Sequence, residues 1–300
     1  MNIPHIPVLY NEVIETFADI TEGYIVDCTL GYGGHSEAIL KNNQNIKMIC
    51  CDQDMEAINF SKKRLAPFGD RVIFEHAQFS TVIKKYATYD IKGVLADIGV
   101  SSLQLDKKER GFGFESENLD MRMNPKNPLS AKEVVNDYSQ SELEEILREY
   151  GEMRDAKRVA KEICDRRPFE SAKELSAMMK KFGGKPKIHP ATLLFQAIRI
   201  EVNNELGELD ELLESIANAG LKDTIVAIIS FHSLEDRIVK RTFKNWTKSC
   251  ICPSEVMRCT CGNSHAIGKI LTKKPIVPTK KEEKENPRSR SSKMRVFKIG

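Results

Sequence analysis

The sequence contains no apolar run that approaches the roughly 20 residues of a membrane span. Its first residues, from Met1 to His5, also lack the charged and apolar regions of a signal peptide. We therefore expect neither a membrane protein nor an exported one. The eight cysteines of this 300-residue chain are then expected to be reduced thiols in the cytoplasm, because disulfide frameworks are typical of short secreted chains.

Motifs of other protein classes are absent as well. No Gly-x-Ser-x-Gly segment exists to present a serine nucleophile, which argues against a hydrolase of that type. The chain also lacks the Gly-x-Gly-x-x-Gly pattern of dinucleotide-binding folds. No internal repeat is visible, so a solenoid is not expected.

The net charge is small, +3, but it is unevenly distributed. From Lys269 to the end there are 11 basic and 3 acidic residues, whereas the rest of the chain has 35 basic and 40 acidic residues. A basic tail on a mildly acidic body favours a polyanionic partner. A solvated, partly disordered terminus is the alternative, and charge alone does not decide between the two.

Predicted strands alternate with predicted helices near the N-terminus. Apolar runs end close to Asp27, Cys51, His76 and Ala96, and helical segments separate them. This alternation predicts an α/β fold with a doubly wound, parallel sheet. Ligands of such sheets bind at the carboxyl ends of the strands, so we expect the functional residues there.

The alternation stops between residues 106 and 204, where no strand is predicted. Capping-box serines, each three residues ahead of a glutamate, open helices there: Ser130, Ser139 and Ser171. A buried strand at 224–230 and an alternating segment at 294–299 return the chain to the sheet. We therefore predict a first core part at 1–105, an all-helical insertion at 106–204 and a second core part at 205–300, with a Cys-rich loop and the basic tail.

The stretch 25–36 is typical of a strand, a glycine-rich turn and a helix. Its glycines let the backbone turn tightly and approach a ligand: Gly31, Gly33 and Gly34. Asp52 ends the next strand, where a doubly wound sheet places the carboxylate that holds ribose hydroxyls. Asp27, at the tip of the first strand, would repel a pyrophosphate and suits a cationic amino-acid group. These positions indicate S-adenosylmethionine as the cofactor.

Asp97 ends the fourth predicted strand, and Ser101 follows in a polar turn. The carboxylate could accept a hydrogen bond from an exocyclic amine or hold the cofactor; a helix-capping turn without a function is the alternative. Methylation of a pyrimidine at C5 needs a thiol nucleophile, and no cysteine occurs between Cys51 and Cys164. We therefore expect direct transfer to nitrogen or oxygen, which requires alignment rather than a metal.

Two further polar groups of the site follow the buried strand at 224–230. His232 and Asp236 are expected to face Asp97 and Ser101 from the adjacent carboxyl end. These four residues are the catalytic candidates.

Four thiols lie within twelve positions near the C-terminus, in the pairs Cys250-x-Cys252 and Cys259-x-Cys261. Such a cluster is typical of a tetrahedral zinc site that orders a loop. Zinc hairpins usually carry two intervening residues rather than one, however. Zinc and plain reduced thiols therefore both stay open.

Nine segments carry a resemblance to a known family, and they run from one terminus to the other. They are His5-x-Pro7-Val8-Leu9, Asp27 to Ser36, Asp97 to Ser102, Arg110 to Phe114, Leu119 to Met123, His189 to Thr192, Phe195 to Ile200, Phe231 to Arg237 and Asn286 to Arg290. Together they resemble the bacterial 16S rRNA cytosine-N4 methyltransferases (the MraW or RsmH type).

The resemblance implies a class I methyltransferase-like fold and a cytoplasmic, S-adenosylmethionine-dependent enzyme. Its expected substrate is the amino nitrogen of one cytosine in the decoding region of 16S rRNA, within the small ribosomal subunit. The matching segments imply these cofactor contacts: Gly33, Gly34, His35, Asp52, Phe79, Asp97 and Gln104. His35 and Gln104 come from the resemblance alone.

The segment after the fourth predicted strand departs from the motif by which related amino-methyltransferases bind the target base. Amino-methyltransferases of the DNA type carry Asp/Asn/Ser-Pro-Pro-aromatic after the fourth strand, whereas this chain has Ile98-Gly99-Val100 there. The aromatic residue that would stack on the base is therefore unassigned, with Phe112, Phe114 and Phe231 as candidates.

Two alternatives to this function remain at the level of sequence. One is a methyltransferase that acts on another RNA or on a protein. The other is a ribosome-assembly protein that binds RNA without turnover, although the presence of both Asp52 and Asp97 argues against it. The oligomeric state is open, with a homodimer as one option.

Overall fold

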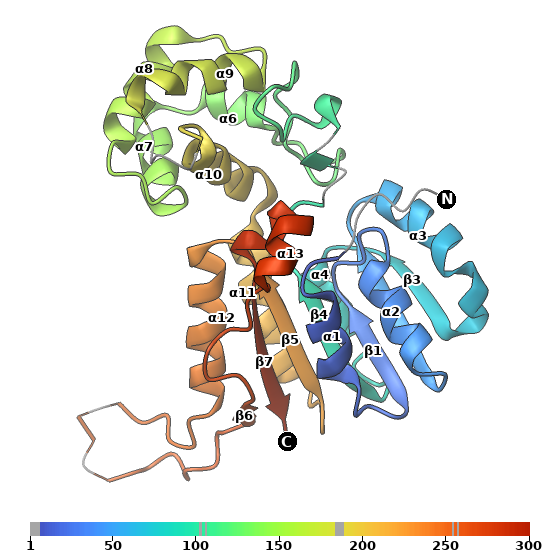
Figure 1. The fold of residues 1–300 in the computed structure, drawn as a ribbon. Helices are drawn as coiled ribbons and strands as arrows, with labels where there is room; N and C mark the ends of the chain where they lie inside the picture. The colour runs from blue at the N-terminus through green and yellow to red at the C-terminus, as the bar shows by residue number, and fades with distance from the viewer. Residues whose placement is uncertain (1–6, 102–103, 106, 184–188, 254, 257) are drawn as a thin grey trace. The chain divides into compact units, whose positions relative to one another are not determined.

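The structure, a computed structural model, describes residues 7–101, 104–105, 107–183, 189–253, 255–256 and 258–300. The chain forms two compact units (Figure 1). The first, the sheet unit, consists of Met1–Gly99 and Gly207–Gly300. The second, the helical unit, consists of Val100–Leu206.

The sheet unit is built on a seven-stranded sheet with the strand order β3-β2-β1-β4-β5-β7-β6. Pairing is parallel from β3 across to β5, whereas β7 runs antiparallel to both β5 and β6. The strands are β1 Gly23–Asp27, β2 Ile46–Asp52, β3 Val72–His76, β4 Ile91–Asp97, β5 Ile225–Ser230, β6 Gly268–Ile270 and β7 Lys293–Ile299. The strand order reverses between β1 and β4, which makes this the switch point where such sheets bind ligands.

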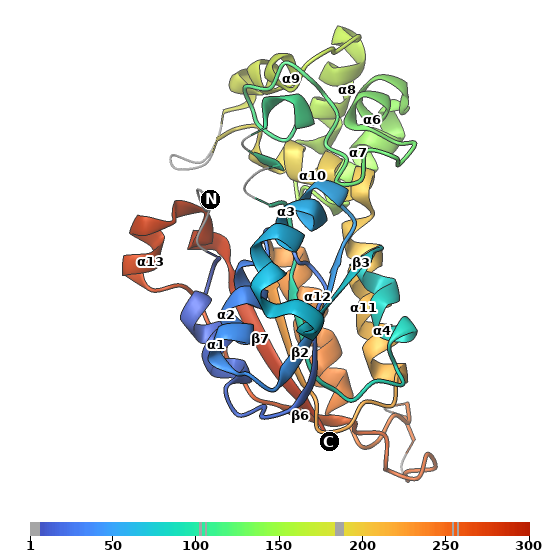
Figure 2. The same ribbon diagram turned by 90° about the vertical axis from the view of Figure 1, so that its right-hand side faces the viewer.

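Helices cover both faces of the sheet, as Figure 2 shows. Adjacent strand residues point to opposite faces. Ile25 of β1 is buried with residues of α1, α2 and α3, whereas Val26 is buried with residues of α4, α11 and α12. The helices and 3-10 turns of this unit are α1 Tyr10–Phe17, α2 Gly34–Asn42, α3 Met55–Leu65, η1 Ala66–Arg71, α4 Phe79–Lys85, α11 Glu205–Asn218, α12 Ser233–Trp246, α13 Lys280–Glu285 and η4 Pro287–Ser291.

The predicted α/β class and its parallel strands are confirmed, as is the closing strand near residue 294. The segment from Lys280 to Arg290 differs from the sequence-based interpretation, which treated it as a charged linker. It forms α13 and η4 instead. The Thr279 side chain accepts a hydrogen bond from the Glu282 amide, and the Glu282 Oε1 atom accepts one of 2.7 Å from the Leu9 amide. An N-cap and a tertiary contact thus order a segment whose composition alone suggested a linker.

The helical unit has its own apolar core, as the capping boxes and apolar stripes predicted. Ser130, Ser139 and Ser171 each cap a helix with the glutamate three positions on. Behind Ser139, Leu143 and Leu147 are fully buried, so the stripe faces the core. The elements are η2 Lys108–Arg110, α6 Ala131–Asp137, α7 Gln140–Glu149, α8 Ala156–Arg166, α9 Ala172–Met179, η3 Lys180–Phe182 and α10 Thr192–Asn203.

Among the described residues, no helix combines the length and the apolar character that crossing a membrane would require.

Candidate active site

The carboxyl ends of the five parallel strands meet at one edge of the sheet unit. Most of the predicted cofactor residues were expected at this edge, and the structure brings the elements that carry them there. Gly33, Gly34 and His35 follow β1, Asp52 ends β2, Phe79 follows β3 and Asp97 ends β4. These positions surround the switch point between β1 and β4.

The turn between β1 and α2 approaches this edge with its backbone. Gly33 has φ +69°, a left-handed conformation that glycine adopts without strain, and an added Cβ would lie 3.1 Å from the Ser61 Oγ atom. Asp27 supports the turn from beneath. It is 1% exposed, and its carboxylate accepts hydrogen bonds from the Ser36 hydroxyl (2.6 Å) and the Thr29 amide (3.2 Å). The structure therefore gives Asp27 a scaffold role rather than the predicted contact with a cationic amino-acid group.

Asp52 links the ends of β1 and β2. Its Oδ2 atom accepts a 2.8 Å hydrogen bond from the Gly31 amide, and its Oδ1 atom accepts one of 2.8 Å from the Asp54 amide. A carboxylate has about four acceptor positions, so about two remain for a ligand. Burial raises the pKa of Asp52 to about 6, and the two backbone N–H groups oppose this rise only in part. The carboxylate is thus held in place and poorly solvated.

His35 and Asp97 face each other across the switch point. His35, in the first turn of α2, is 7% exposed, and its Nε2 atom lies 3.7 Å from the Asp97 Oδ2 atom. Both ring nitrogens of His35 and the Oδ1 atom of Asp97 are buried without a hydrogen-bond partner among the described residues. Because burying such atoms unpaired is costly, this cluster is suited to a polar ligand.

The Asp97 backbone is fixed by a residue that the sequence did not identify. The Thr29 Oγ1 atom accepts a 2.6 Å hydrogen bond from the Asp97 amide. Thr29 follows β1 and Asp97 ends β4, so this contact joins the two strands at the switch point. In the sequence, only the position of Thr29 between Asp27 and the glycine turn could have indicated that it contributes to the site.

Ser101 and Gln104 belong to the helical unit. The Ser101 amide donates a 2.9 Å hydrogen bond to the Gln104 Oε1 atom, and the Gln104 amide donates one of 3.3 Å to the Ser101 Oγ atom. The two side chains thus fix each other. Their roles toward cofactor and base stay predictions.

His232 follows β5 and is the N-cap of α12. Its Nε2 atom lies 3.1 Å from the Oε1 atom of Glu235, which is completely buried. The other Glu235 oxygen accepts hydrogen bonds from the Phe231 amide (2.8 Å) and the His232 amide (3.2 Å). The structure thus places His232 at the predicted edge, in a capping box that fixes its ring. Glu235 was missed as the residue that orients it.

Asp236 lies one position further along α12 and is engaged by two cations of β7. The Arg295 Nε atom lies 2.6 Å from its Oδ1 atom, the Arg295 Nη2 atom lies 3.2 Å from its Oδ2 atom, and the Lys293 Nζ atom lies 3.7 Å from Oδ2. Burial alone would raise the pKa of Asp236, but these cations lower it below its ordinary value. The carboxylate is therefore occupied by the protein itself.

The three aromatic candidates for base stacking differ in their availability. Phe112 is buried in the core of the helical unit. Phe114 stacks on His189, with ring centroids 4.2 Å apart and planes 15° apart. Phe231 is half-buried at the end of β5, and an added Cβ on Gly99 would lie 3.3 Å from its ring. Of the three, Phe231 stands in the sheet unit next to the end of β4.

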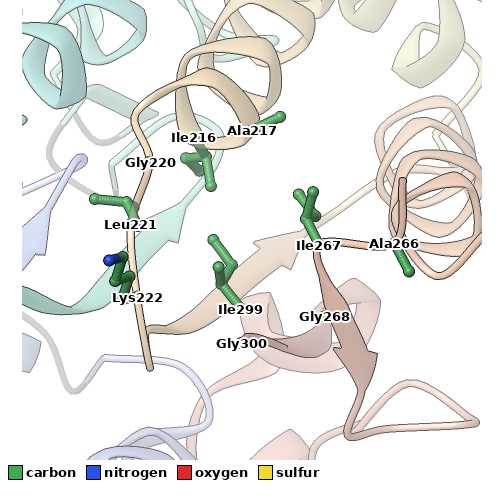
Figure 3. Close-up of a pocket in the computed structure, with 10 residues that line it drawn as sticks. All are labelled: Ile216, Ala217, Gly220, Leu221, Lys222, Ala266, Ile267, Gly268, Ile299 and Gly300. Atoms are coloured by element: carbon green, nitrogen blue, oxygen red, sulfur yellow. The ribbon is translucent and has the colours of Figure 1, made fainter. Parts of the chain in front are cut away.

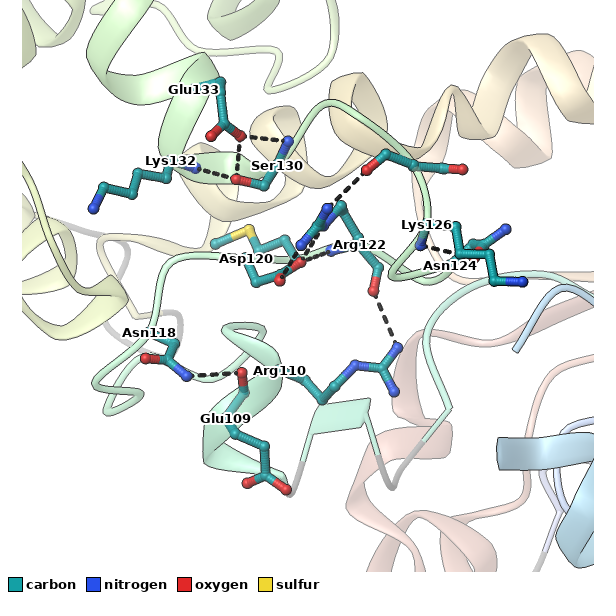
Figure 4. Close-up of polar contacts among 12 residues, drawn as sticks. Glu109, Arg110, Asn118, Asp120, Arg122, Asn124, Lys126, Ser130, Lys132 and Glu133 are labelled. Carbon is teal, nitrogen blue, oxygen red and sulfur yellow. Dashed lines mark hydrogen bonds and ion pairs between the residues drawn. The ribbon is translucent and has the colours of Figure 1, made fainter. Parts of the chain in front are cut away.

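Two segments of the family resemblance form a polar scaffold within the helical unit (Figure 4). The Arg110 guanidinium donates to the Arg122 and Met123 carbonyl oxygens, at 3.1 and 2.9 Å. Arg122 in turn pairs with Asp120, with 2.9 Å between Nη2 and Oδ2. An added Cβ on Gly111, at φ +77°, would lie 2.4 Å from the Asp120 amide nitrogen. These contacts give Arg110, Gly111, Asp120 and Arg122 a role in the folding of the helical unit.

A cavity of about 510 Å³ lies elsewhere in the sheet unit, between the end of α11 and the C-terminus of β7 (Figure 3). Most of its lining is apolar or glycine, including Ile216, Leu221, Ile267 and Ile299. The residues before β5 contribute to it, so it lies at the amino ends of the parallel strands, opposite the edge described above. It holds none of the predicted site residues.

The MraW methylase family matches residues 2–299. The ribosomal RNA small subunit methyltransferase H of Aliarcobacter butzleri is 66% identical over 299 residues, covering 100% of both chains. The protein of the same name from Sulfurimonas denitrificans is 60% identical over 303 residues, covering 99% of this chain and 98% of the relative. By this match and these identities, the protein belongs to the MraW methylase family.

Proposed function

We propose that this protein transfers a methyl group from S-adenosylmethionine to N4 of a cytosine in the decoding region of 16S rRNA, within the small ribosomal subunit and in the cytoplasm. Family membership and the names of the relatives support rRNA methylation. The observation that carries the proposal is the cluster of buried polar atoms on His35 and Asp97, which lack hydrogen-bond partners among the described residues and lie at the switch point of the sheet.

The residues of the sheet unit fit S-adenosylmethionine. Asp52 has acceptor positions left for the ribose hydroxyls. The backbone at Gly31, where an added Cβ would meet only the Thr29 carbonyl oxygen at 4.0 Å, leaves space for close approach, and His35 and Asp97 offer polar atoms for the remaining groups of the cofactor. When bound, S-adenosylmethionine supplies an electrophilic methyl group on a sulfonium centre.

The protein's task is then to activate and position the amine. The cytosine amino group is a poor nucleophile because its lone pair is delocalised into the ring, and it gains positive charge on methylation. Asp97 would accept a hydrogen bond from this amine, which concentrates electron density on N4 and stabilises the developing charge. Ser101 would offer a second acceptor. The base must be held out of its stack, and Phe231 is the proposed stacking partner.

His232 and Asp236 would act from the β5 side. His232 is fixed by Glu235 at the strand end and would border the base. Asp236 would be a positioning residue, because Arg295 and Lys293 already engage both of its oxygens. It would hold the start of α12, and with it His232, against β7.

The basic C-terminal segment would contribute to RNA binding less than its composition suggests. Lys293 and Arg295 pair with Asp236, and Lys298 pairs with Asp223. Met294 and Phe297 of β7 are completely buried, so the end of this segment is part of the sheet rather than a detachable tail. RNA contacts are therefore better tested by charge substitutions than by truncation.

The decisive experiment identifies the methylated atom. The full chain is incubated with labelled S-adenosylmethionine and small ribosomal subunits that lack the modification, and the RNA is digested and analysed by mass spectrometry. We expect label on N4 of one cytidine from the decoding region. Label on C5, on a ribose or on a protein would contradict the proposed reaction, and subunit binding without label would favour a non-catalytic RNA-binding role.

Replacing Asp52 with alanine is expected to weaken S-adenosylmethionine binding at least about 10-fold, because charge-assisted hydrogen bonds to the ribose contribute about 1.5–3 kcal/mol each. Isothermal titration calorimetry measures the effect. Asp54→Ala is the matched control: it removes the N-cap of α3, where the Asp54 Oδ1 atom accepts a hydrogen bond from the Glu56 amide, but leaves the Asp52 carboxylate in place. Equal affinities of Asp52→Ala and the native protein would refute the ribose contact.

Binding of S-adenosylmethionine is also expected to depend on pH through Asp52. Its pKa is about 6 in the free protein, so the carboxyl is neutral below pH 6 and ionised above it. Ribose hydroxyls donate preferentially to the ionised form, so affinity should fall as the pH drops from 7 to 5, by up to about 10-fold per pH unit below the pKa. Calorimetry at pH 5, 6, 7 and 8 on native protein and Asp52→Asn isolates this contribution. A profile that is the same in both proteins would assign the pH dependence to another group.

A further inference from the structure

The two Cys-x-Cys pairs come together in the segment between α12 and β6. Figure 1 shows this segment as an arm that extends beyond the end of α12, and we call its described residues, 247–253, 255–256 and 258–267, the arm. The Sγ atoms of all four cysteines lie within 4.8 Å of one another. They are Cys250, Cys252, Cys259 and Cys261.

The distances between these sulfurs match the edges of a tetrahedral metal site. Cys250 and Cys259 are 3.6 Å apart at Sγ, Cys259 and Cys261 are 3.5 Å apart, and Cys250 and Cys261 are 3.8 Å apart. Four sulfurs placed about 2.3 Å from a central Zn²⁺ have edges of about 3.8 Å. A disulfide would instead bring one pair to about 2.05 Å and leave the others apart.

The backbone holds the two pairs in a reciprocal arrangement. The amide of Ile251, between the first two cysteines, donates to the Cys261 Sγ atom at 3.4 Å. The amide of Thr260, between the last two, donates to the Cys252 Sγ atom at 3.3 Å. In an extended segment, residues i and i+2 point to the same side, so one intervening residue lets both thiols of a pair converge. A pair of cysteines with one intervening residue, rather than the usual two, is therefore compatible with a tetrahedral zinc site.

The chemistry of the cluster selects the kind of cation. Sulfur ligands suit a soft or borderline divalent cation, and four of them in a tetrahedral arrangement suit Zn²⁺, whereas hard cations such as Mg²⁺ and Ca²⁺ prefer oxygen ligands.

From this geometry we infer that Cys250, Cys252, Cys259 and Cys261 bind one structural Zn²⁺ that orders the arm. The arm needs such a crosslink because apolar side chains such as Ile251 (60% exposed) and Val256 (41% exposed) are not buried in a core. Hydrogen bonds close its base, from the Ile267 amide to the Trp246 carbonyl at 2.9 Å and from the His265 amide to the Ser249 carbonyl at 3.0 Å. The inference does not depend on the proposed function.

The metal content of the full-length protein, purified without chelators and with a thiol reductant, tests the inference. We expect about one zinc per chain by elemental analysis. Cys259→Ser/Cys261→Ser should lose it, whereas Cys164→Ser, which changes a half-buried cysteine of the helical unit, should keep it. Less than about one-fifth of a zinc in the native protein after incubation with equimolar Zn²⁺, or iron in its place, would overturn the inference.

Alkylation of the native protein provides a readout that does not depend on whether variants fold. Zn²⁺ should slow iodoacetamide modification of all four arm cysteines at least about 10-fold and leave the rate at Cys164 unchanged, as peptide mass spectrometry can show. A strong chelator should restore their reactivity and open the arm to proteolysis between residues 247 and 267. Rates at the four cysteines that do not respond to Zn²⁺, or disulfide-linked peptides under reducing conditions, would establish plain thiols or disulfides instead.

Discussion

Replacing Asp97 with alanine is expected to lower the single-turnover rate of methyl transfer at saturating S-adenosylmethionine by about 100-fold or more. The Asp97 Oδ1 atom is buried without a partner among the described residues, and Thr29 fixes the Asp97 backbone at the end of β4. A preorganised acceptor at this point needs no reorganisation when charge develops on the amine. Losing one such electrostatic contact in other active sites costs about 100- to 1,000-fold in rate.

The design of this experiment separates chemistry from cofactor binding, because Asp97 is proposed to serve both. Cofactor affinity is measured by calorimetry, and the rate is measured at a cofactor concentration that saturates each variant. Asp90→Ala is the matched control: Asp90 directly precedes β4 at the opposite end of that strand and pairs with Lys92 at the surface, with 2.9 Å between Oδ1 and Nζ. Its rate should stay within about twofold of the native rate. Weaker binding in Asp97→Ala with an unchanged saturated rate would show that Asp97 only holds the cofactor.

The strand ends that form the candidate site could be predicted because they depend on local patterns. Apolar runs that end in Asp52 and Asp97 identify strands and place the carboxylates at their carboxyl ends. Capping-box serines gave the starts of three helices in the helical unit, since the cap and its glutamate are only three residues apart. Signals of this kind lie within one turn or one strand.

The parts that could not be predicted depend on contacts between distant segments. Asp27 turns inward because Ser36, nine residues on, donates to it, and nothing in the sequence distinguishes this from a ligand contact. The end of the basic tail is an interior strand of the sheet, paired with β5 and β6, and its Met294 and Phe297 are buried while Lys293 and Lys298 are not. The partner of Asp236 lies 59 residues away in the chain. Charge counts and periodicity do not contain such pairings.

The Asp236–Arg295 pair leads to the second large expected effect. The two side chains are 15% and 10% exposed, and Asp236→Ala would leave the Arg295 guanidinium buried without its main partner. Breaking such a pair from one side costs about 3 kcal/mol or more. We expect thermal unfolding at a clearly lower temperature and a single-turnover rate reduced by about 100-fold, with S-adenosylmethionine affinity within about twofold of native. Asp223→Asn, which removes the charge of an exposed partner of Lys298 on the same strand and keeps a residue type that tolerates the left-handed backbone at this position (φ 53°), should change stability by less than about 1 kcal/mol.

A double substitution decides how Asp236 acts. Asp236→Leu/Arg295→Met replaces the ion pair with apolar side chains, a change that often restores or exceeds the stability of a buried pair. If Asp236 only positions α12 and His232, as its contacts with Arg295 and Lys293 indicate, this variant should recover stability and return to within about 10-fold of the native rate. Recovered stability with a rate still about 100-fold low would show instead that the carboxylate itself acts on the substrate. Because chemical denaturation and single-turnover methylation are measured on the same preparations, the two readouts distinguish a positioning residue from a catalytic one.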